Sequence, residues 1–149
     1  MTRTLLLAVH ITGVAAWLGA NFVQLVLTPR FAKEDRAVTK AWTDATIMLG
    51  MRYYNAAGGL IAVSGVLLVL DGDWSWSSGF IWVGIAVVVI GGAMGGLLFA
   101  PQSQRRSAAL ASGDDAAAAA TLRTIIPAAV LDTALILTAL LAMIDKWQA

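Results

Sequence analysis

The chain has 149 residues, of which 59% are hydrophobic and only 13% are charged. A net charge of +1 gives no nucleic-acid signal, and the absence of Cys excludes a disulfide framework, a thiolate nucleophile, an iron–sulfur cluster and a Cys-based zinc site. A mean hydropathy of +0.78 is typical of an integral membrane protein, so we expect an all-α, polytopic chain in a lipid bilayer.

Four apolar stretches are each near the length of about 20 residues that a bilayer-spanning helix requires. They run from Thr4 to Leu27, Ile47 to Leu70, Phe80 to Ala100, and Thr124 to Ile144. The first has no clear small-residue cleavage site and is longer than a typical signal-peptide core, which predicts a retained helix. Residues 1–149 are therefore expected to form a single membrane domain, a four-transmembrane-helix bundle with short loops.

The segments between these stretches are partly helical. Phe31 to Thr46 alternates charged and apolar residues at near-helical spacing without Gly or Pro, which predicts a cytoplasmic interfacial helix leading into the second span. Asp114 and Asp115 follow Gly113 and indicate a helix start. The Ala-rich run that follows is expected to join the fourth span, with a kink at Pro127.

Basic residues gather in two of the three connecting segments. These residues are Arg30, Lys33, Arg36, Lys40, Arg105, Arg106 and Arg123. Both segments should be cytoplasmic by the positive-inside rule, which places both termini outside the cytoplasm. The segment from Asp71 to Gly79 has no Lys or Arg, and an aromatic belt is expected on its side, formed by Trp74, Trp76, Trp82 and Trp147.

Polar residues in the first span recur on one helical face. They are His10, Trp17, Asn21, Gln24 and Thr28. Polar side chains avoid lipid because they cannot be satisfied there, so this stripe should face the bundle interior or a bound partner. The third span has a stripe of small residues, which allows close helix packing or leaves room for a flat ligand: Gly84, Gly91 and Gly95, with Gly92 and Gly96 beside them.

Asp132 is the first candidate for a functional residue. Burying an ionisable group at membrane depth costs roughly several kcal/mol unless a partner or water stabilises it. Counting residues along the helices predicts a polar intramembrane layer, made of Asn21, Gln24, Arg52, Asn55 and Asp132. Arg52 either pairs with Asp132 or extends to the headgroups. Asp132 itself is either functional or a structural group hydrogen-bonded between helices.

His10 lies on the same inner face at a different level, about 9 Å below the outer end of its span. It is either hydrogen-bonded to a neighbouring helix or an axial ligand to haem b, which needs an imidazole nitrogen and a flat apolar slot. The chain has no second His. A sixth ligand would therefore be a Met such as Met94 or Met143, a residue of another subunit, or absent.

The first helix resembles that of the HemJ-like/CopD-like superfamily of small four-helix bacterial integral membrane proteins. The likeness rests on the run from His10 to Gly19, HITGVAAWLG, followed by Pro29-Arg30-Phe31. It continues weakly through Met51-Arg52-Tyr53 and the run from Leu122 to Pro127. The chain departs from the HemJ-like pattern at the start of the third helix, where it reads IWVGI from Ile81 to Ile85, without His or Lys.

This resemblance implies a haem-binding or redox-associated protein of the bacterial plasma membrane, or one that handles copper. The cofactor-binding positions that it implies are His10, Trp17 and Arg30, with His10 as the haem iron ligand. Two other classes stay open: a non-catalytic accessory or assembly subunit of a larger membrane complex, and a small-solute, proton or copper transporter. Whether the protein is an enzyme is left undecided. A chain of this size has little room to enclose a large substrate alone, so a homo-oligomer or a larger membrane complex is expected.

Overall fold

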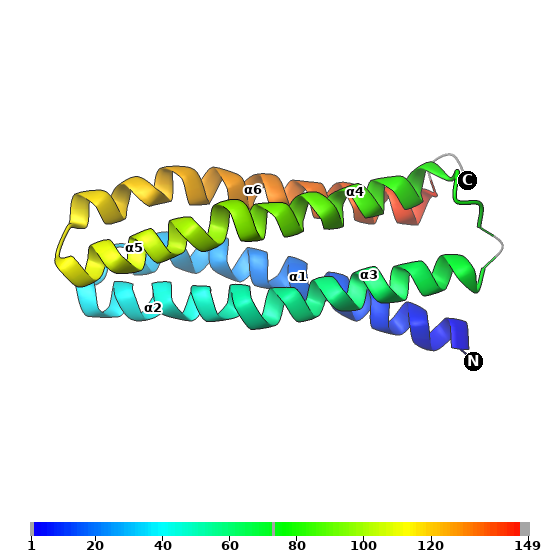
Figure 1. The fold of residues 1–149 in the computed structure, drawn as a ribbon, viewed down its shortest axis with the longest axis horizontal. Helices are drawn as coiled ribbons and strands as arrows, with labels where there is room; N and C mark the ends of the chain where they lie inside the picture. Colours follow the sequence, from blue (N-terminus) through cyan, green and yellow to red (C-terminus); the bar gives the residue numbers. More distant parts are fainter. Residues whose placement is uncertain (1, 73, 147–149) are drawn as a thin grey trace.

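The computed structural model describes residues 2–72 and 74–146 and shows four long antiparallel helices, with no strand among those residues (Figure 1). The first helix is α1 (Thr2–Phe31). The second joins α2 (Arg36–Met48), the π-helical η1 (Leu49–Tyr54) and α3 (Asn55–Leu70). The third joins α4 (Gly79–Met94), the π-helical η2 (Gly95–Phe99) and α5 (Ala100–Ser112), and the fourth is α6 (Asp115–Asp145). The predicted all-α four-helix bundle is confirmed.

Each long helix has the length and composition needed to cross a membrane. The helices contain 30, 35, 34 and 31 residues. At about 1.5 Å per residue even the shortest is about 45 Å long, whereas a hydrocarbon core is roughly 30 Å thick. The helices are therefore longer than the hydrocarbon core is thick, and the bundle extends beyond it.

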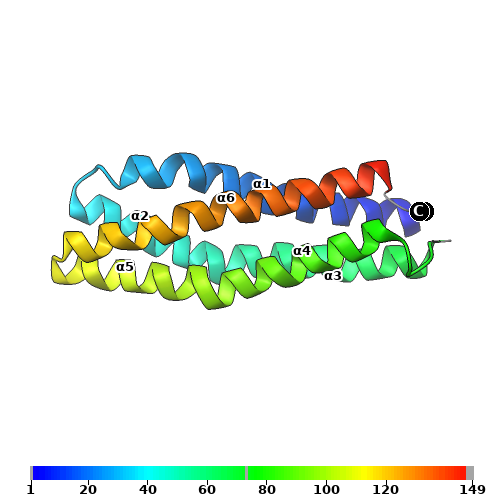
Figure 2. The ribbon, with the colours of Figure 1, turned by 90° about the horizontal axis from the view of Figure 1, so that it is seen from above.

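The two ends of the bundle differ. The chain termini and the α3–α4 connection lie at one end, and the α1–α2 and α5–α6 connections lie at the other (Figures 1 and 2). We call the second the basic end, because Arg36, Lys40, Arg105 and Arg106 belong to it. Along the bundle α1 packs on α3 and α6, α4 packs on α6, and α5 packs on α2 and α6.

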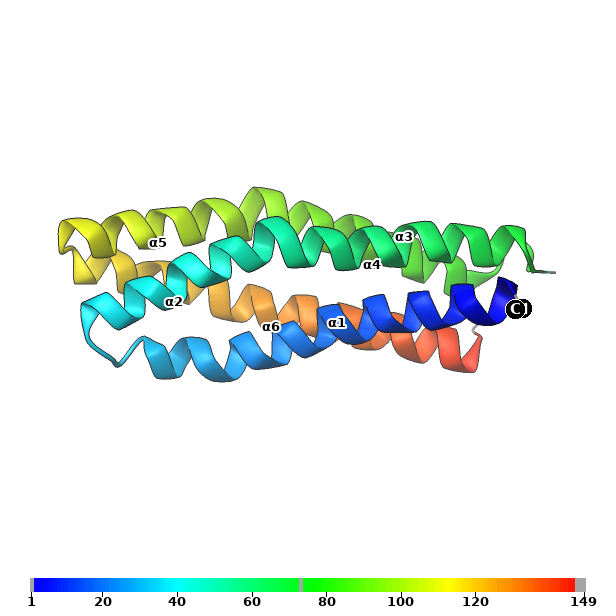
Figure 3. The same ribbon diagram turned by 90° about the horizontal axis from the view of Figure 1, so that it is seen from below.

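The predicted interfacial helix forms as α2, but it does not lie apart from the second span. It continues through η1 into α3, so that α2 and α3 follow one another along the bundle (Figure 3). No Gly or Pro interrupts the chain between Arg36 and Leu49, and the Asp35 side chain caps the start of α2 by accepting from the Val38 N–H. Likewise α6 remains helical through Pro127.

The core lies where all four long helices meet, and it consists of Trp17, Ala57, Ile61, Val87, Ile136 and Ala139. The contact between α1 and α3 depends on Gly13, because a Cβ there would lie 2.8 Å from Ile61 Cγ1 and 3.2 Å from the Ala57 carbonyl oxygen. Large apolar residues elsewhere face outward, among them Leu97, which is 82% exposed. This distribution suits a bundle surrounded by lipid rather than by water.

Aromatic residues lie near the end that carries the termini. Trp76 and Trp82 are exposed. The Trp74 ring meets the Phe80 ring edge-on. The Lys146 ammonium lies 4.8 Å from the centroid of the Trp74 ring. Trp147, the fourth residue of the predicted belt, lies outside the described residues.

Candidate functional site

The carboxyl of Asp132 is buried in the middle of the bundle, where it is 4% exposed. Its Oδ2 atom accepts two hydrogen bonds from α1, one from Trp17 Nε1 at 3.1 Å and one from Asn21 Nδ2 at 2.8 Å. Both donors come from the polar stripe of the first helix, which faces inward as predicted. The stripe thus supplies the direct partners of the one acidic residue at this depth in α6.

Further polar side chains extend this cluster toward the basic end. The Tyr54 hydroxyl donates to Asn21 Oδ1 at 2.8 Å, and Gln24 Nε2 donates to the Tyr54 oxygen at 2.6 Å. Asn21 Nδ2 also contacts Thr133 Oγ1 at 3.2 Å. We call this set the polar layer; its members are Trp17, Asn21, Gln24, Tyr54, Asp132 and Thr133. It joins α1, η1 and α6 by hydrogen bonds.

The second carboxylate oxygen of Asp132 has no partner. Among the described residues, Oδ1 is the buried side-chain nitrogen or oxygen atom that lacks a hydrogen-bond partner. It faces Gly91 of α4, where a Cβ would lie 3.1 Å from Oδ1 and 2.7 Å from Trp17 Cζ2. A buried acceptor without a donor costs about 1–3 kcal/mol, and more when it is charged. The absence of a side chain at Gly91 therefore leaves room for the carboxyl without satisfying it.

Two π-helical segments interrupt the α-helices near the polar layer. Tyr54 is the last residue of η1, and η2 begins four residues after Gly91. Single π-helical turns inside α-helices occur frequently at functional sites. They provide a sign of function that is independent of the buried carboxyl.

Three predicted site residues are not part of this layer. Arg52 and Asn55 are exposed, and the Asn55 amide donates to the Met51 carbonyl of its own helix. Of the two alternatives for Arg52, the pair with Asp132 does not form among the described residues. Arg52 is two residues from Tyr54 and thus faces almost the opposite side of the helix. Arg30, at the end of α1, is also exposed and far along the helix from His10.

His10 occupies a separate level, nearer the chain termini, and is 8% exposed. Its Nδ1 atom lies 3.1 Å from the Ile61 carbonyl oxygen and 3.1 Å from Ser64 Oγ. The Ser64 hydroxyl itself donates to the Leu60 carbonyl. Because the Ile61 oxygen can only accept, Nδ1 is the ring nitrogen that donates, and in the neutral imidazole Nε2 then carries no proton.

A cavity of about 40 Å³ adjoins His10, Trp17, Gly84 and Met143. A histidine whose Nδ1–H is held by a backbone carbonyl is oriented as metal-ligating histidines are. The space is far below the roughly 300–1,000 Å³ of typical ligand pockets, and a Cβ at Gly84 would already lie 2.5 Å from Met143 Cε. The ring nitrogen of His10 thus suits an axial ligand, but the cavity does not fit haem.

The described residues also contain no group of three or more His, Cys, Asp or Glu that could hold a metal ion. The glycine stripe of the third span divides accordingly: Gly84 and Gly91 lie against side chains of other helices, whereas a Cβ at Gly92, Gly95 or Gly96 would meet nothing within 4 Å. Close packing, rather than a slot for a flat ligand, explains the first two.

Two members of the polar layer were not predicted from the sequence. Thr133 follows the acidic residue directly, and its hydroxyl also donates to the Ala129 carbonyl, as an ordinary helical threonine does. Tyr54 could have been found from periodicity, because it continues the inward face that Ala57, Ile61 and Ser64 define in α3.

Comparison with protein-family models, with curated proteins and with solved structures finds no match to this chain. The HemJ-like/CopD-like resemblance of the first helix therefore stays a prediction, and the function has to be argued from the polar layer itself.

Proposed function

We propose that this chain is a small proton-translocating membrane protein, in which Asp132 binds and releases the proton. The observation that carries this proposal is the buried, unpartnered Oδ1 atom of a carboxyl whose Oδ2 atom accepts two hydrogen bonds. Intramembrane acidic residues are rare, and they often mark ion pathways and proton relays.

The two oxygens of the Asp132 carboxyl have different surroundings. Oδ2 accepts hydrogen bonds from Trp17 and Asn21, and these two bonds fix the orientation of the carboxyl. Oδ1 accepts none, so its lone pairs remain available to a proton. Oδ1 is therefore the atom at which the proposed proton binding takes place.

The polar layer orients the carboxyl but does not provide a complete path. Tyr54 and Gln24 extend the polar groups from Asp132 toward the basic end. The Asn21 amide, which lies between Asp132 and Tyr54, is a poor proton relay. On the other side, the 40 Å³ cavity beside Trp17 could hold only a few waters, since one water needs at least about 10–15 Å³. Translocation therefore requires a movement that lets water reach Oδ1, which faces α4 at Gly91, four residues before η2 begins.

The other classes of function have weaker support. Haem binding requires a volume that the His10 cavity lacks. Copper transport is expected to use several His, Met or Cys ligands, and the chain has one His and no Cys. A purely structural subunit needs no buried carboxylate oxygen without a partner. Location in a bacterial plasma membrane, with the basic end cytoplasmic, stays a prediction, as does assembly into an oligomer or larger complex.

Proton flux into liposomes tests the proposal directly. The purified protein is reconstituted with a pH-sensitive dye inside the vesicles, and a potassium gradient with valinomycin supplies the driving potential. We expect flux from the wild type, none from Asp132→Asn, and wild-type flux from Asp71→Asn. The last is a matched control, because it makes the same chemical change at an exposed position of the α3–α4 connection.

Infrared spectroscopy of the same samples provides a second measurement. Titration should produce a carboxylic-acid C=O band that is present in Asp71→Asn and missing in Asp132→Asn. Equal flux in all three proteins, or a wild-type protein that moves no protons above empty vesicles, would contradict the proposed function.

A further inference from the structure

A larger cavity lies at the basic end, away from the polar layer. Its volume is about 380 Å³, and it is bounded by the α1–α2 connection, α2, α5 and α6. The polar residues that line it are Glu34, Arg36, Thr39, Arg106 and Asp115. This volume falls within the roughly 300–1,000 Å³ of small-molecule sites.

Arg106 is the buried cation of this cavity and is 5% exposed. Its Nη1 donates to the Ala118 carbonyl oxygen at 2.7 Å, and its Nε donates to Thr43 Oγ1 at 3.3 Å. Both acceptors are neutral, and no ion pair involves Arg106 within residues 2–72 and 74–146. Burying a charge without an opposite charge is costly, and a guanidinium with five N–H donors keeps donors for a further partner.

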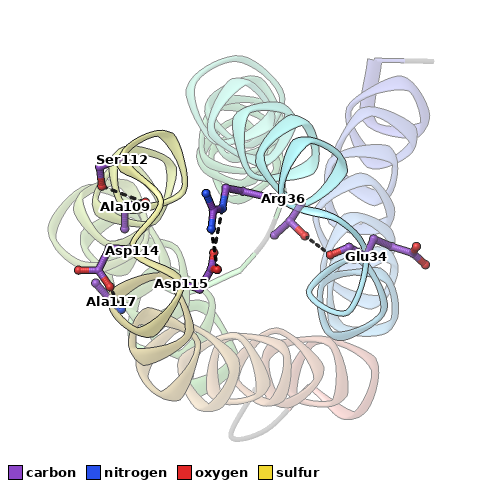
Figure 4. Close-up of polar contacts among 8 residues, drawn as sticks. Glu34, Arg36, Ala109, Ser112, Asp114, Asp115 and Ala117 are labelled. Atoms are coloured by element: carbon purple, nitrogen blue, oxygen red, sulfur yellow. Dashed lines mark hydrogen bonds and ion pairs between the residues drawn. The ribbon is translucent and has the colours of Figure 1, made fainter.

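The other charged groups at the cavity do not neutralise Arg106. Arg36 forms a two-point pair with Asp115, in which Nε and Nη2 lie 3.1 Å and 2.8 Å from the two carboxylate oxygens. This pair crosses from α2 to α6 and is well exposed, with side chains 50% and 68% accessible (Figure 4). The Glu34 side chain is exposed and points away from the pair. The uncompensated charge in the interior of the cavity is thus positive.

We propose that this cavity binds a phosphate-bearing anion, with Arg106 as its buried cationic ligand and the Arg36–Asp115 pair at its mouth. Arginine presents parallel N–H groups that match the oxygens of a phosphate. Arg36 can exchange its carboxylate partner for the same anion, because an exposed ion pair is only weakly held. The phosphate belongs either to the headgroup of an anionic lipid or to a soluble phosphate compound.

Thermal unfolding in an uncharged detergent tests the proposal, because a ligand that binds only the folded state raises the unfolding temperature. The probes are inorganic phosphate and a short-chain phosphatidylglycerol, with short-chain phosphatidylcholine as the zwitterionic reference. A shift with inorganic phosphate identifies a soluble source. A shift with phosphatidylglycerol above that with phosphatidylcholine, and none with phosphate, identifies a lipid headgroup. No shift with either anion overturns the proposal.

Variants place the binding at Arg106. We expect Arg106→Gln to weaken binding about tenfold or more, since it removes hydrogen bonds between a charged donor and a charged acceptor, which are stronger than neutral ones. Arg105→Gln is the matched control, because it removes the same charge from the adjacent, exposed position of α5 and should leave binding unchanged. Equal losses in the two variants would show a general charge effect and overturn the site.

A third variant keeps the test decisive if Arg106→Gln does not fold. Asp115→Asn removes the carboxylate that occupies Arg36 and leaves Arg106 and its buried contacts in place. Anion binding should then become severalfold tighter, because both guanidinium groups are available. Weaker binding in Asp115→Asn would contradict the assigned roles.

Discussion

Replacing Gly91 by Ala should destabilise the bundle because this position is where α4 touches the polar layer. A Cβ at Gly91 would lie 2.7 Å from Trp17 Cζ2, 3.0 Å from Trp17 Cη2 and 3.1 Å from Asp132 Oδ1. The Trp17 ring cannot move away freely, since its Nε1 donates to Asp132 Oδ2 and its faces pack in the core. The new methyl group must therefore displace either the ring or the whole of α4.

The magnitude follows from a comparison with Gly92→Ala. Forcing one extra methyl group into a packed core typically costs about 1–3 kcal/mol. Ala also favours a helix over Gly by about 1 kcal/mol, which partly masks that cost at Gly91. Gly92 is the next residue of the same helix, and a Cβ there meets nothing within 4 Å. The difference in unfolding free energy between the two variants thus isolates the steric term, and we expect Gly91→Ala to be less stable than Gly92→Ala by about 1–3 kcal/mol.

Reversible unfolding in mixed micelles of a mild detergent and sodium dodecyl sulfate, followed by circular dichroism, measures this difference. Disruption of the hydrogen bond between Trp17 and Asp132 should accompany it and reduce proton flux in the liposome assay. Unfolding free energies of the two variants that agree within about 0.5 kcal/mol, the usual scatter of surface substitutions, would refute the close contact of α4 with the polar layer.

Three further predictions use the same preparations. Gly84→Ala should cost less than about 1 kcal/mol although its Cβ would fall 2.5 Å from Met143 Cε, because the end of a methionine side chain is flexible and has the neighbouring cavity to enter; a loss above about 2 kcal/mol contradicts this. Trp17→Phe should lower the unfolding free energy by about 1–2 kcal/mol through loss of the N–H donor, and this effect should shrink in an Asp132→Ala background, as a double-mutant cycle would show. Absorption spectra of the folded protein, oxidised and then reduced with dithionite, should lack a Soret band because the cavity beside His10 is too small for haem; a band that disappears in His10→Ala would overturn that conclusion.

The inward face of the first helix could be predicted because lipid imposes a simple rule on it. A polar side chain that faces hydrocarbon has nothing to bond with, so the spacing of His10, Trp17 and Asn21 defines the buried side by itself. All three are at most 8% exposed. The same reasoning selected Asp132 as buried in the bundle, and it is. The role that we propose for it in proton translocation, in contrast, depends on which carboxyl oxygen lacks a hydrogen-bond donor, and that follows only from three-dimensional packing.

The inward face of the second helix was harder to predict, because the depth of a residue in the membrane does not determine which way its side chain points. Counting residues along the axis placed Arg52 and Asn55 at the level of the polar layer, but it took no account of their angle around the helix. The buried positions Ala57 and Ile61 are four residues apart, and three residues before Ala57 the same face reaches Tyr54. Tyr54 was not among the predicted site residues, yet its hydroxyl joins α1 to the second helix.

Arg106 shows where a hydropathy-based division into spans and loops loses information. Its sequence neighbourhood is polar enough to be assigned to a cytoplasmic loop, and the positive-inside rule then uses it only as a count of charge. The helices instead continue several turns past the apolar stretches, so α2, α5 and α6 still pack on one another at the basic end and enclose this guanidinium. An arginine in a solvated loop needs no partner. Arg106 is 5% exposed and is bonded only to neutral oxygens, so its charge would be stabilised by a bound anion. Arg106 is therefore a candidate ligand because the helices are long enough to enclose it, and the number of basic residues in the segment does not reveal this.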